Sequence, residues 1–219
     1  MSSKSRMAHV VWDWNGTLWD DTHLCIAIMN EMLRERGMPA LDRARYQQIF
    51  DFPVIRYYER LGFDFKAEPF AVVGAEFIRR YELRRLEAAL HPPARPTLQA
   101  LRELGLQQSV LSAYRHETLE ELLISAGIRD FFMGVVGSDN VYAEGKVAQG
   151  RQWIQNLGVS PERVVLIGDT EHDFEVATAM GCPCLLVATG YHPRSRLEKL
   201  GAPVLDSLDQ IPSWLSAQR

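Results

Sequence analysis

Carboxylates follow two apolar segments of the chain at the points where those segments end. Asp13 comes directly after residues 9–12, and Asp169 follows the apolar run at 163–167. A carboxylate at the end of a buried strand can act as a nucleophile, as a metal ligand, or as both. Asn15, two residues beyond Asp13, is an amide and cannot carry a proton in acid/base catalysis. These residues predict nucleophilic or metal chemistry beside a position that cannot transfer protons.

A third carboxylate, Asp173, lies four positions after Asp169, across the turn into a predicted helix. This spacing lets both carboxylates face one point, although the pair alone could simply cap that helix. Together with Asp13 they would form a cluster that repels itself unless a cation joins it. An all-oxygen site with room for water suits Mg²⁺, so the three residues predict a magnesium site.

Groups suited to binding an anion occur near the ends of other predicted elements. Lys146 opens a predicted helix after the loop 137–140 and supplies a point charge for a phosphoryl oxygen or for the carboxylates. Ser112 offers a hydroxyl, and Ala113 offers a backbone N–H. The amides around Asn15 and Gly16 could hold the rest of a phosphoryl group, because glycine lets the backbone approach closely. Taken singly, Lys146 is also compatible with a surface lysine and Ser112 with an ordinary strand-end serine.

Hydrophobic periodicity predicts the elements that would position these groups. Residues 22–36, 41–50, 54–61 and 69–90 are predicted to be helical, with no strand between 21 and 90. From residue 91 onward, predicted strands alternate with helices: strands at 108–112, 132–136, 163–167, 184–187 and 203–205, and helices at 95–104, 116–126, 146–157 and 173–180. This alternation indicates βαβ units and a mainly parallel sheet.

The predicted fold class is α/β, a Rossmann-like, mainly parallel sheet core with an inserted all-helical cap domain. Residues 1–20 and 92–219 would form the core, and residues 21–91 would form the cap. In an open parallel sheet the carboxyl ends of the strands share one edge. Asp13, Ser112 and Asp169 are therefore expected to converge on one crevice.

Composition limits the kinds of partner. With 219 residues, 47% of them hydrophobic, the chain suits one globular domain with a sizeable insertion, or two small domains. A net charge of −4 without a basic stripe gives no electrostatic case for nucleic acid.

The basic residues at 79–85 alternate with glutamates and predict an ion-paired helix face. No apolar run suits a membrane span or a signal peptide, and Cys25, Cys182 and Cys184 are expected to be reduced, so we expect a cytoplasmic protein.

The chain resembles the haloacid dehalogenase (HAD)-like hydrolase superfamily along essentially its whole length. It is similar to phosphoglycolate phosphatases, which have a small helical cap after the first motif. Four motifs carry the resemblance, in order: Asp13-Trp14-Asn15-Gly16-Thr17, Ser112, Lys146, and Gly168-Asp169-Thr170-Glu171-His172-Asp173.

The resemblance implies a Mg²⁺-dependent phosphatase that hydrolyses a small phosphorylated metabolite, a phosphoglycolate-like phosphomonoester, as a monomer or homodimer. Asp13 would attack phosphorus and form an aspartyl-phosphate. The implied Mg²⁺ ligands are Asp13, the backbone carbonyl of Asn15, Asp169 and Asp173. The resemblance implies that Ser112 and Lys146 bind the phosphoryl oxygens, and Gly16, Thr17 and Ala113 are further residues that we expect to bind substrate.

Asn15 departs from the family pattern, which has an aspartate there to protonate the leaving alcohol and activate water. The loss expected without that aspartate is of the order of 10²- to 10⁴-fold. The leaving group could be acidic enough to need no proton, as in an acyl or aryl phosphate, or Asn15 could be an engineered replacement. Another group could supply the proton, the nearby candidates being His172, Glu171, Tyr114 and His116. The alternative function is a phospholigand-binding or regulatory protein on a weakened scaffold.

Substrate selection would fall to the helical insertion. Arg45, Arg56 and Tyr57 lie near the kinked apolar stretch 50–53, which could face the crevice. Arg56 could clamp a substrate carboxylate or a second phosphate. It is also compatible with a solvated helix position.

Overall fold

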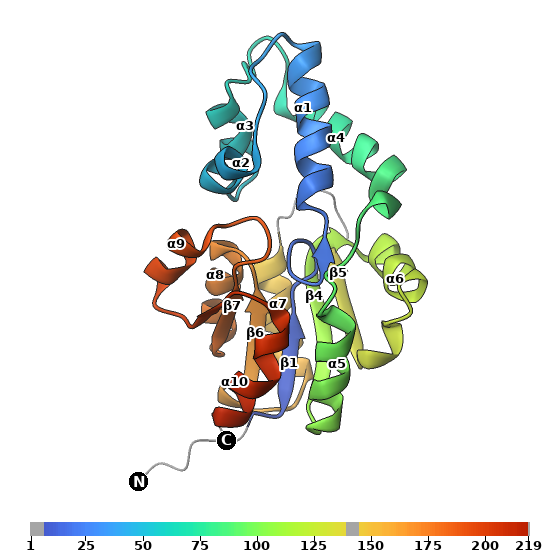
Figure 1. Cartoon of the computed structure of the whole chain (residues 1–219), viewed down its shortest axis with the longest axis vertical. Coiled ribbons are helices and arrows are strands. Elements are labelled where there is room, and N and C mark those ends of the chain that lie inside the picture. The colour runs from blue at the N-terminus through green and yellow to red at the C-terminus, as the bar shows by residue number, and fades with distance from the viewer. Residues whose placement is uncertain (1–6, 139–144, 219) are drawn as a thin grey trace.

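The core of the protein is a six-stranded parallel sheet (Figure 1). The computed structural model describes residues 7–138 and 145–218. The strand order is β5-β4-β1-β6-β7-β8. The strands are β1 (His9–Trp12), β4 (Gln107–Arg115), β5 (Gly134–Ser138), β6 (Val164–Gly168), β7 (Cys184–Val187) and β8 (Val204–Leu205). Because β1 lies in the middle, between β4 and β6, Asp13 leaves the sheet at its centre.

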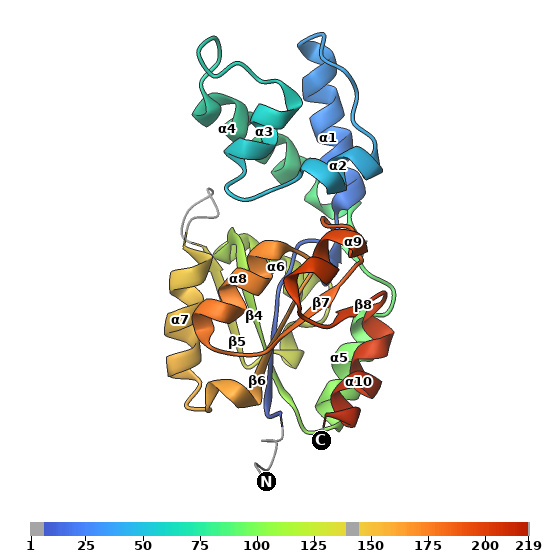
Figure 2. The same ribbon diagram turned by 90° about the vertical axis from the view of Figure 1, so that its left-hand side faces the viewer.

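Helices cover both faces of this sheet (Figure 2). Val10 packs in one buried cluster with α5 (Ala94–Glu103), α6 (His116–Ser125) and α10 (Ile211–Ala217). Val11 packs in the other with α7 (Lys146–Asn156), α8 (Glu171–Met180) and α9 (Arg194–Leu197). All four residues of β1 are buried, as expected for a strand covered on both faces. The predicted α/β fold with a parallel sheet is confirmed.

Four helices lie between residues 20 and 89 of the chain and stack beyond one end of the sheet (Figures 1 and 2). They are α1 (Thr22–Glu35), α2 (Arg43–Ile49), α3 (Ile55–Leu61) and α4 (Phe70–Arg84). The ion-paired face predicted on the last of them is present, because Arg80 and Arg84 pair with glutamates of α1 and α4 and with Glu87. The division of the chain at residues 21 and 91 stays a prediction.

Two short strands join this helical block to the core. β2 (Trp19–Asp20) and β3 (Ala89–Leu90) pair antiparallel where the chain enters and leaves the block. The prediction that 69–90 is helical without any strand is therefore wrong at its end, since α4 stops at Arg84 and the 3₁₀ turn η1 (Arg85–Glu87) follows. A two-residue strand has no periodicity that a sequence can reveal, and its partner lies far away in the chain.

Other differences concern element ends. β4 continues through Ser112 to Arg115 with a shift of register after Leu111, so Ser112 does not end its strand. Gly137 and Ser138 belong to β5 rather than to a loop, and positions 139 and 140 lie outside the described residues. The short helices α9 and α10 were not predicted, because neither is long enough to show a clear helical period. The remaining 3₁₀ turns are η2 (Arg129–Phe131), η3 (Pro161–Arg163), η4 (Glu198–Leu200) and η5 (Leu208–Gln210).

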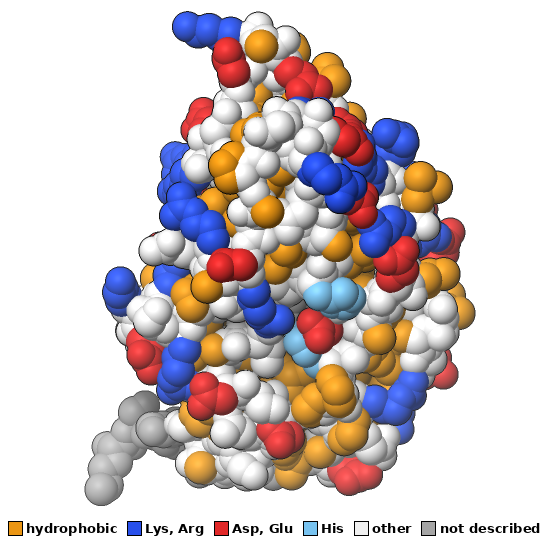
Figure 3. Space-filling model, turned by 45° about the horizontal axis from the view of Figure 1, so that its top comes forward, with side chains coloured by type: hydrophobic (Ala, Val, Ile, Leu, Met, Phe, Trp, Pro, Cys, Tyr) orange, Lys and Arg blue, Asp and Glu red, His pale blue; other side chains and the backbone are white. Residues whose placement is uncertain are grey.

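The surface and the thiols agree with the composition. Figure 3 shows acidic and basic side chains interspersed over the face it presents. Cys25, Cys182 and Cys184 are free and buried. Within residues 7–138 and 145–218, none of the helices combines the length and apolarity that crossing a bilayer requires.

Candidate active site

Three buried carboxylates converge at the carboxyl edge of the sheet. Asp13 follows β1, Asp169 follows β6, and Asp173 lies in the first turn of α8. One oxygen from each lies within 4.8 Å of the others. The edge is fixed by the backbone, since the N–H of Asp13 donates to the carbonyl of Ile167 at 2.9 Å. The fold therefore brings residues 13, 169 and 173 together, at the place where the sequence predicted them to converge.

Lys146 lies against this cluster at the start of α7. Its Nζ is 2.5 Å from Asp13 Oδ1 and 2.5 Å from Asp173 Oδ1, and only 4% of its side chain is exposed. Burial alone would lower the pKa of Lys146, but the charges of Asp13 and Asp173 outweigh burial and raise it. Lys146 is therefore a buried cation of the site and not a surface lysine.

The three carboxyl groups differ in how their surroundings shift their pKa values. Burial, reinforced by the charge of Asp173, raises the pKa of Asp13 to about 6 despite the opposing effect of Lys146. Burial and the neighbouring carboxylates raise the pKa of Asp169 well above its ordinary value. Burial also acts to raise the pKa of Asp173, but the Lys146 ammonium more than offsets it. One ammonium thus faces three carboxyl groups, and a further cation would relieve their repulsion.

The donor set fits a hard divalent cation. All three side chains offer oxygen only, they are buried, and their oxygens approach one another closely. Asp169 already accepts from the Tyr191 N–H at 2.6 Å and from Thr17 Oγ1 at 2.8 Å, but each carboxylate oxygen has a second lone pair available. The other oxygen of Asp173, Oδ2, caps α8 through Thr170, so capping and cluster formation coexist in one residue.

Gly16 and Thr17 hold the carboxylates in place. The Thr17 hydroxyl is fully buried and lies 3.0 Å from Asp13 Oδ2 as well as 2.8 Å from Asp169 Oδ1. Gly16 has φ +79°, and a Cβ there would collide with the Asp169 carboxylate. The position therefore requires glycine for two reasons. Neither Gly16 nor Thr17 lines the cavity that opens beside Asp13. Their contact with substrate stays a prediction.

A cavity of about 260 Å³ opens beside Asp13, and we call it the Asp13 cavity. Of the residues predicted from the sequence, it brings together Asp13, Asn15, Ser112, Ala113, Lys146 and Asp173. The Ser112 hydroxyl is buried and accepts from the Tyr114 N–H at 3.0 Å. Arg56 is exposed on α3 and does not line the cavity, so the structure does not bring it to the site.

Asp21 is a residue of this site that sequence reasoning missed. It is fully buried, lines the Asp13 cavity, and accepts hydrogen bonds from Asn15 Nδ2 at 2.7 Å and from the hydroxyls of Tyr81 and Tyr191. Burial raises the pKa of Asp21 above its ordinary value, against the effect of these hydrogen bonds. Its signal in the sequence was only an acid just after the first motif. Its aromatic partners are 60 and 170 positions away.

The proton-transfer candidates named from the sequence differ in placement. His172 and Tyr114 line the Asp13 cavity, whereas Glu171 and His116 do not. The Tyr114 hydroxyl donates to Glu82 at 2.6 Å, and His172 Nδ1 lies 3.1 Å from Glu175. The structure thus leaves two of the four candidates in contact with the cavity.

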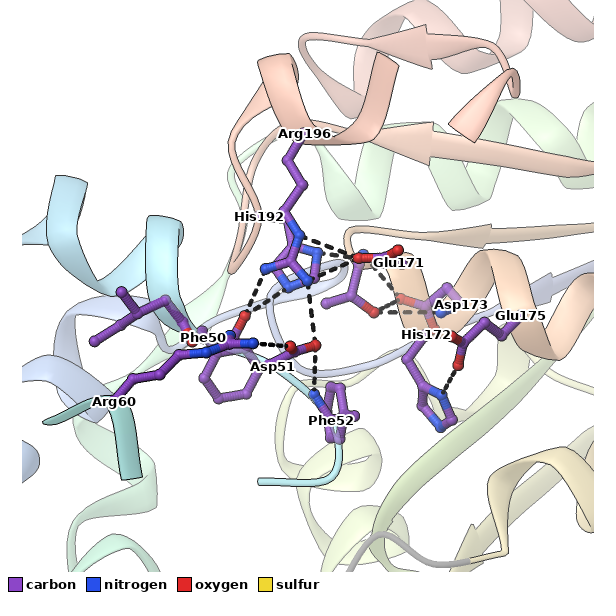
Figure 4. A network of polar contacts seen from close by, with 12 residues as sticks. Phe50, Asp51, Phe52, Arg60, Glu171, His172, Asp173, Glu175, His192 and Arg196 are labelled. Carbon is purple, nitrogen blue, oxygen red and sulfur yellow. Dashed lines mark hydrogen bonds and ion pairs between the residues drawn. The ribbon is translucent and has the colours of Figure 1, made fainter. Parts of the chain in front are cut away.

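Arg196 of the core binds the loop that follows α2 (Figure 4). Arg196 donates to the carbonyl of Phe50 at 2.7 Å, to Asp51 Oδ1 at 3.1 Å and to Glu171 Oε2 at 2.7 Å. His192 completes the contact, with Nε2 3.1 Å from the Phe50 carbonyl and Nδ1 accepting from the Glu171 N–H at 3.0 Å. We call Arg196 and His192 with these partners the Arg196 clamp. It holds the helical block over the carboxylates.

Comparisons with known proteins show the family to which the chain belongs. The family model of haloacid dehalogenase-like hydrolases matches residues 10–187, so the chain belongs to that family. A phosphoglycolate phosphatase from Rhodospirillum rubrum is 28% identical, over 94% of this chain and 90% of its own length. One from Pseudomonas savastanoi is 25% identical, over 92% of this chain and 77% of its own length.

Solved structures show the same fold. A haloacid dehalogenase-like family hydrolase from Streptococcus pneumoniae has a TM-score of 0.81 at 20% identity, covering 95% of this chain and 98% of that one. A protein from Clostridium acetobutylicum, described as a predicted phosphatase, has a TM-score of 0.82 at 19% identity, covering 97% and 100%. The resemblance drawn from the motifs is therefore confirmed, and the chain is similar to phosphatases that act on phosphoric monoesters.

Proposed function

We propose that this chain is a Mg²⁺-dependent phosphatase that hydrolyses a small phosphorylated metabolite through an aspartyl-phosphate on Asp13. The observation that carries the proposal is the placement of Asp13 beside a 260 Å³ cavity, within 2.5 Å of Lys146 and among two further buried carboxylates. The names of the relatives make phosphoglycolate the first metabolite to test.

The residues around the Asp13 cavity would have different roles in the reaction. Asp13, the backbone carbonyl of Asn15, Asp169 and Asp173 would hold Mg²⁺, which when bound neutralises charge on phosphoryl oxygens. Lys146, Ser112 and Ala113 line the same cavity and would bind those oxygens. The Asp13 oxygen forms the new bond to phosphorus as the bond to the leaving oxygen breaks. Water then attacks phosphorus and releases phosphate and free Asp13.

Residues 21–91 would act as a cap over this chemistry. The Arg196 clamp and the hydrogen bond from the Tyr191 hydroxyl to Asp21 support that role, because they join the helical block to the core at the Asp13 cavity. A closed cap excludes water while the phosphoryl group is transferred. Free buried thiols support a cytoplasmic location.

Asn15 favours a second candidate, a protein that binds a phosphorylated ligand without efficient turnover. An amide cannot protonate the leaving group or activate water, while the groups that would capture phosphate are all present.

Steady-state hydrolysis of acetyl phosphate and p-nitrophenyl phosphate distinguishes the two. We expect turnover that needs Mg²⁺ and disappears with EDTA and in Asp13→Ala. Phosphate binding measured calorimetrically, with no turnover of either substrate, would support the second candidate and contradict the first.

A further inference from the structure

A second cavity adjoins the Asp13 cavity on the side of the helical block. It has a volume of about 340 Å³, and its lining shares four side chains with the Asp13 cavity: Cys25, Phe77, Ile78 and Tyr191. We call it the aromatic cavity. The two cavities therefore adjoin at these four side chains.

Rings dominate the lining of the aromatic cavity. They include Tyr46, Phe50, Tyr57, Tyr58, Phe70 and Tyr191. Several meet at the distances of aromatic pairs, with centroids 5.3 Å apart for Phe50 and Tyr57 and 4.8 Å apart for Phe50 and Tyr191. No acidic, basic or histidine side chain of the described residues lines it. Such walls suit a flat apolar group and not a carboxylate.

One buried polar atom of the lining residues, the Tyr57 hydroxyl, has no hydrogen-bond partner in the described part of the chain. Only 2% of Tyr57 is exposed. By contrast, the hydroxyls of Tyr81 and Tyr191 both bond to Asp21. A buried hydroxyl without a partner is unfavourable, but this oxygen has almost no accessible surface, so a polar substituent on a bound ring reaches it only where the side chains around it move.

Tyr191 links the aromatic cavity to the chemistry. Its backbone N–H donates to Asp169, its hydroxyl donates to Asp21, and its ring lies in the wall that the cavities share. The ring that would contact a leaving group is thus part of the same residue that positions a carboxylate of the cluster.

The cations of the Asp13 cavity do not favour a substrate with a second anionic group. Among its described lining residues the permanently charged cations are Lys146, held by Asp13 and Asp173, and Arg115, whose Nε pairs with Glu117 at 2.6 Å. The lining also carries Asp21 and Glu82. A neutral leaving group fits this balance better than the carboxylate of phosphoglycolate.

We propose that the substrate is an aryl phosphate, whose ring occupies the aromatic cavity while its phosphoryl group lies at Asp13. The proposal rests on the proposed phosphatase function and deepens it. The Asp13 oxygen bonds to phosphorus, and the bond to the aryl oxygen breaks with its electron pair on that oxygen. A phenol has a pKa near 10, against about 15.7 for water, so the aryloxide leaves without a proton and takes one from water afterwards. Asn15 is then no obstacle to the first step.

The test compares kcat/KM for four phosphates on the full chain with Mg²⁺: 2-naphthyl, phenyl, n-octyl and acetyl phosphate. Phenol and 2-naphthol are similarly acidic, so their comparison reports on the cavity and not on the leaving group. We expect 2-naphthyl phosphate to exceed phenyl phosphate by about tenfold or more, and to exceed n-octyl phosphate as well. Turnover of acetyl phosphate with no preference for 2-naphthyl phosphate would overturn this proposal and leave the phosphatase intact. Turnover of none of the four would overturn both.

A substitution that fills the aromatic cavity tests where the ring binds. Gly74 is buried in the lining on α4, and a Cβ there meets nothing closer than Phe70 at 3.6 Å. Gly74→Leu should reduce the ratio of 2-naphthyl to acetyl phosphate kcat/KM by about tenfold. Val72→Leu, at a 55% exposed position of the same helix, is the control and should leave the ratio unchanged. An unchanged ratio in folded Gly74→Leu would contradict the assignment of the ring to this cavity.

Discussion

The side-chain amide of Asn15 donates a hydrogen bond of 2.7 Å to the carboxyl group of Asp21, and Tyr81 contacts both residues. Position 15 therefore faces an acid that is already present. The carboxyl group that the family has at position 15 is missing, but a buried one lies within hydrogen-bond distance of that position. An amide at 15 and a carboxyl at 21 are complementary, whereas two carboxyl groups there would not be.

The variant Asn15→Asp tests this relationship. It places a second carboxyl group against Asp21, so we expect a loss of stability of about 1–3 kcal/mol in urea unfolding. The exchange Asn15→Asp with Asp21→Asn restores one amide and one carboxyl, and should recover most of that loss. The two substitutions would then be coupled by roughly 0.5–3 kcal/mol. Additive losses would show that the two side chains do not interact.

The same exchange addresses catalysis. A carboxyl group at position 15 could donate and accept the proton that Asn15 cannot, so turnover of an alkyl phosphate such as phosphoglycolate should rise by the order of 10²-fold in the double variant. Asp21→Asn alone, which supplies no group at position 15, is its control. If the double variant gains nothing over that control, proton transfer at position 15 does not limit this enzyme.

The sequence predicted where the residues of the carboxylate cluster lie better than it predicted their surroundings. Asp13, Lys146, Asp169 and Asp173 were found because strand ends and helix starts fix where such residues lie in a parallel sheet. Asp21 and the aromatic cavity were not found, because they depend on side chains brought together from α2, α3, α4 and the segment after β7. Packing between elements distant in sequence leaves no local pattern.

Arg56 illustrates the same limit. The sequence predicted helices in this region, but the direction of a side chain on a short helix depends on how that helix packs. Phe50 and Asp51 instead contact the core through the Arg196 clamp, and Arg43 and Gln47 donate to the carbonyls of Thr189 and Gly190.

Removing the contacts of the Arg196 clamp should open the Asp13 cavity to solvent. Arg196→Ala removes donors to Phe50, Asp51 and Glu171, and charged hydrogen bonds of this kind contribute about 1.5–3 kcal/mol. We expect amide hydrogen exchange in residues 47–53 to accelerate by about tenfold or more, and KM to rise. Arg194→Ala is the matched control, because Arg194 lies on the same helix but pairs with Glu198 and Asp206 of the core. Equal effects of the two variants would contradict the clamp.

The clamp should also weaken in acid. Burial, with the nearby Arg196 charge, lowers the pKa of His192 to about 4, and its Nδ1 accepts from the Glu171 N–H, so the folded protein holds it neutral. The unfolded chain binds a proton near pH 6.5, so stability is full above that pH and falls as pH drops from 6.5 towards 4.

Urea unfolding across that range measures the effect. The slope of the unfolding free energy against pH should be smaller in His192→Gln than in the parent by about 1.4 kcal/mol per pH unit at most. Because His9 also has a pKa lowered to about 4 by burial, only the difference between the two proteins reports on His192. Identical slopes would show that His192 is not held neutral.

Lys146 should contribute to stability as well as to catalysis. Lys146→Met leaves Asp13, Asp169 and Asp173 without their buried cation, and removing one partner of a buried ion pair costs about 3–5 kcal/mol. Thermal unfolding in EDTA should show this loss, and Mg²⁺ should restore a larger part of it in Lys146→Met than it adds to the parent, because it replaces the missing charge. An equal Mg²⁺ effect in both proteins would argue against a shared metal and lysine site.

The acceptance of the phosphoryl group by Asp13 can be tested directly. Because Asn15 cannot activate water, the aspartyl-phosphate should form faster than it is hydrolysed, and it should therefore accumulate. The protein is mixed with p-nitrophenyl phosphate and Mg²⁺, quenched in acid within the first turnover, and digested for mass spectrometry. We predict a burst of p-nitrophenol, with one phosphoryl group on the peptide that contains Asp13 and none in Asp13→Ala. Turnover that persists in Asp13→Ala, or a phosphoryl group on another residue, would contradict the account.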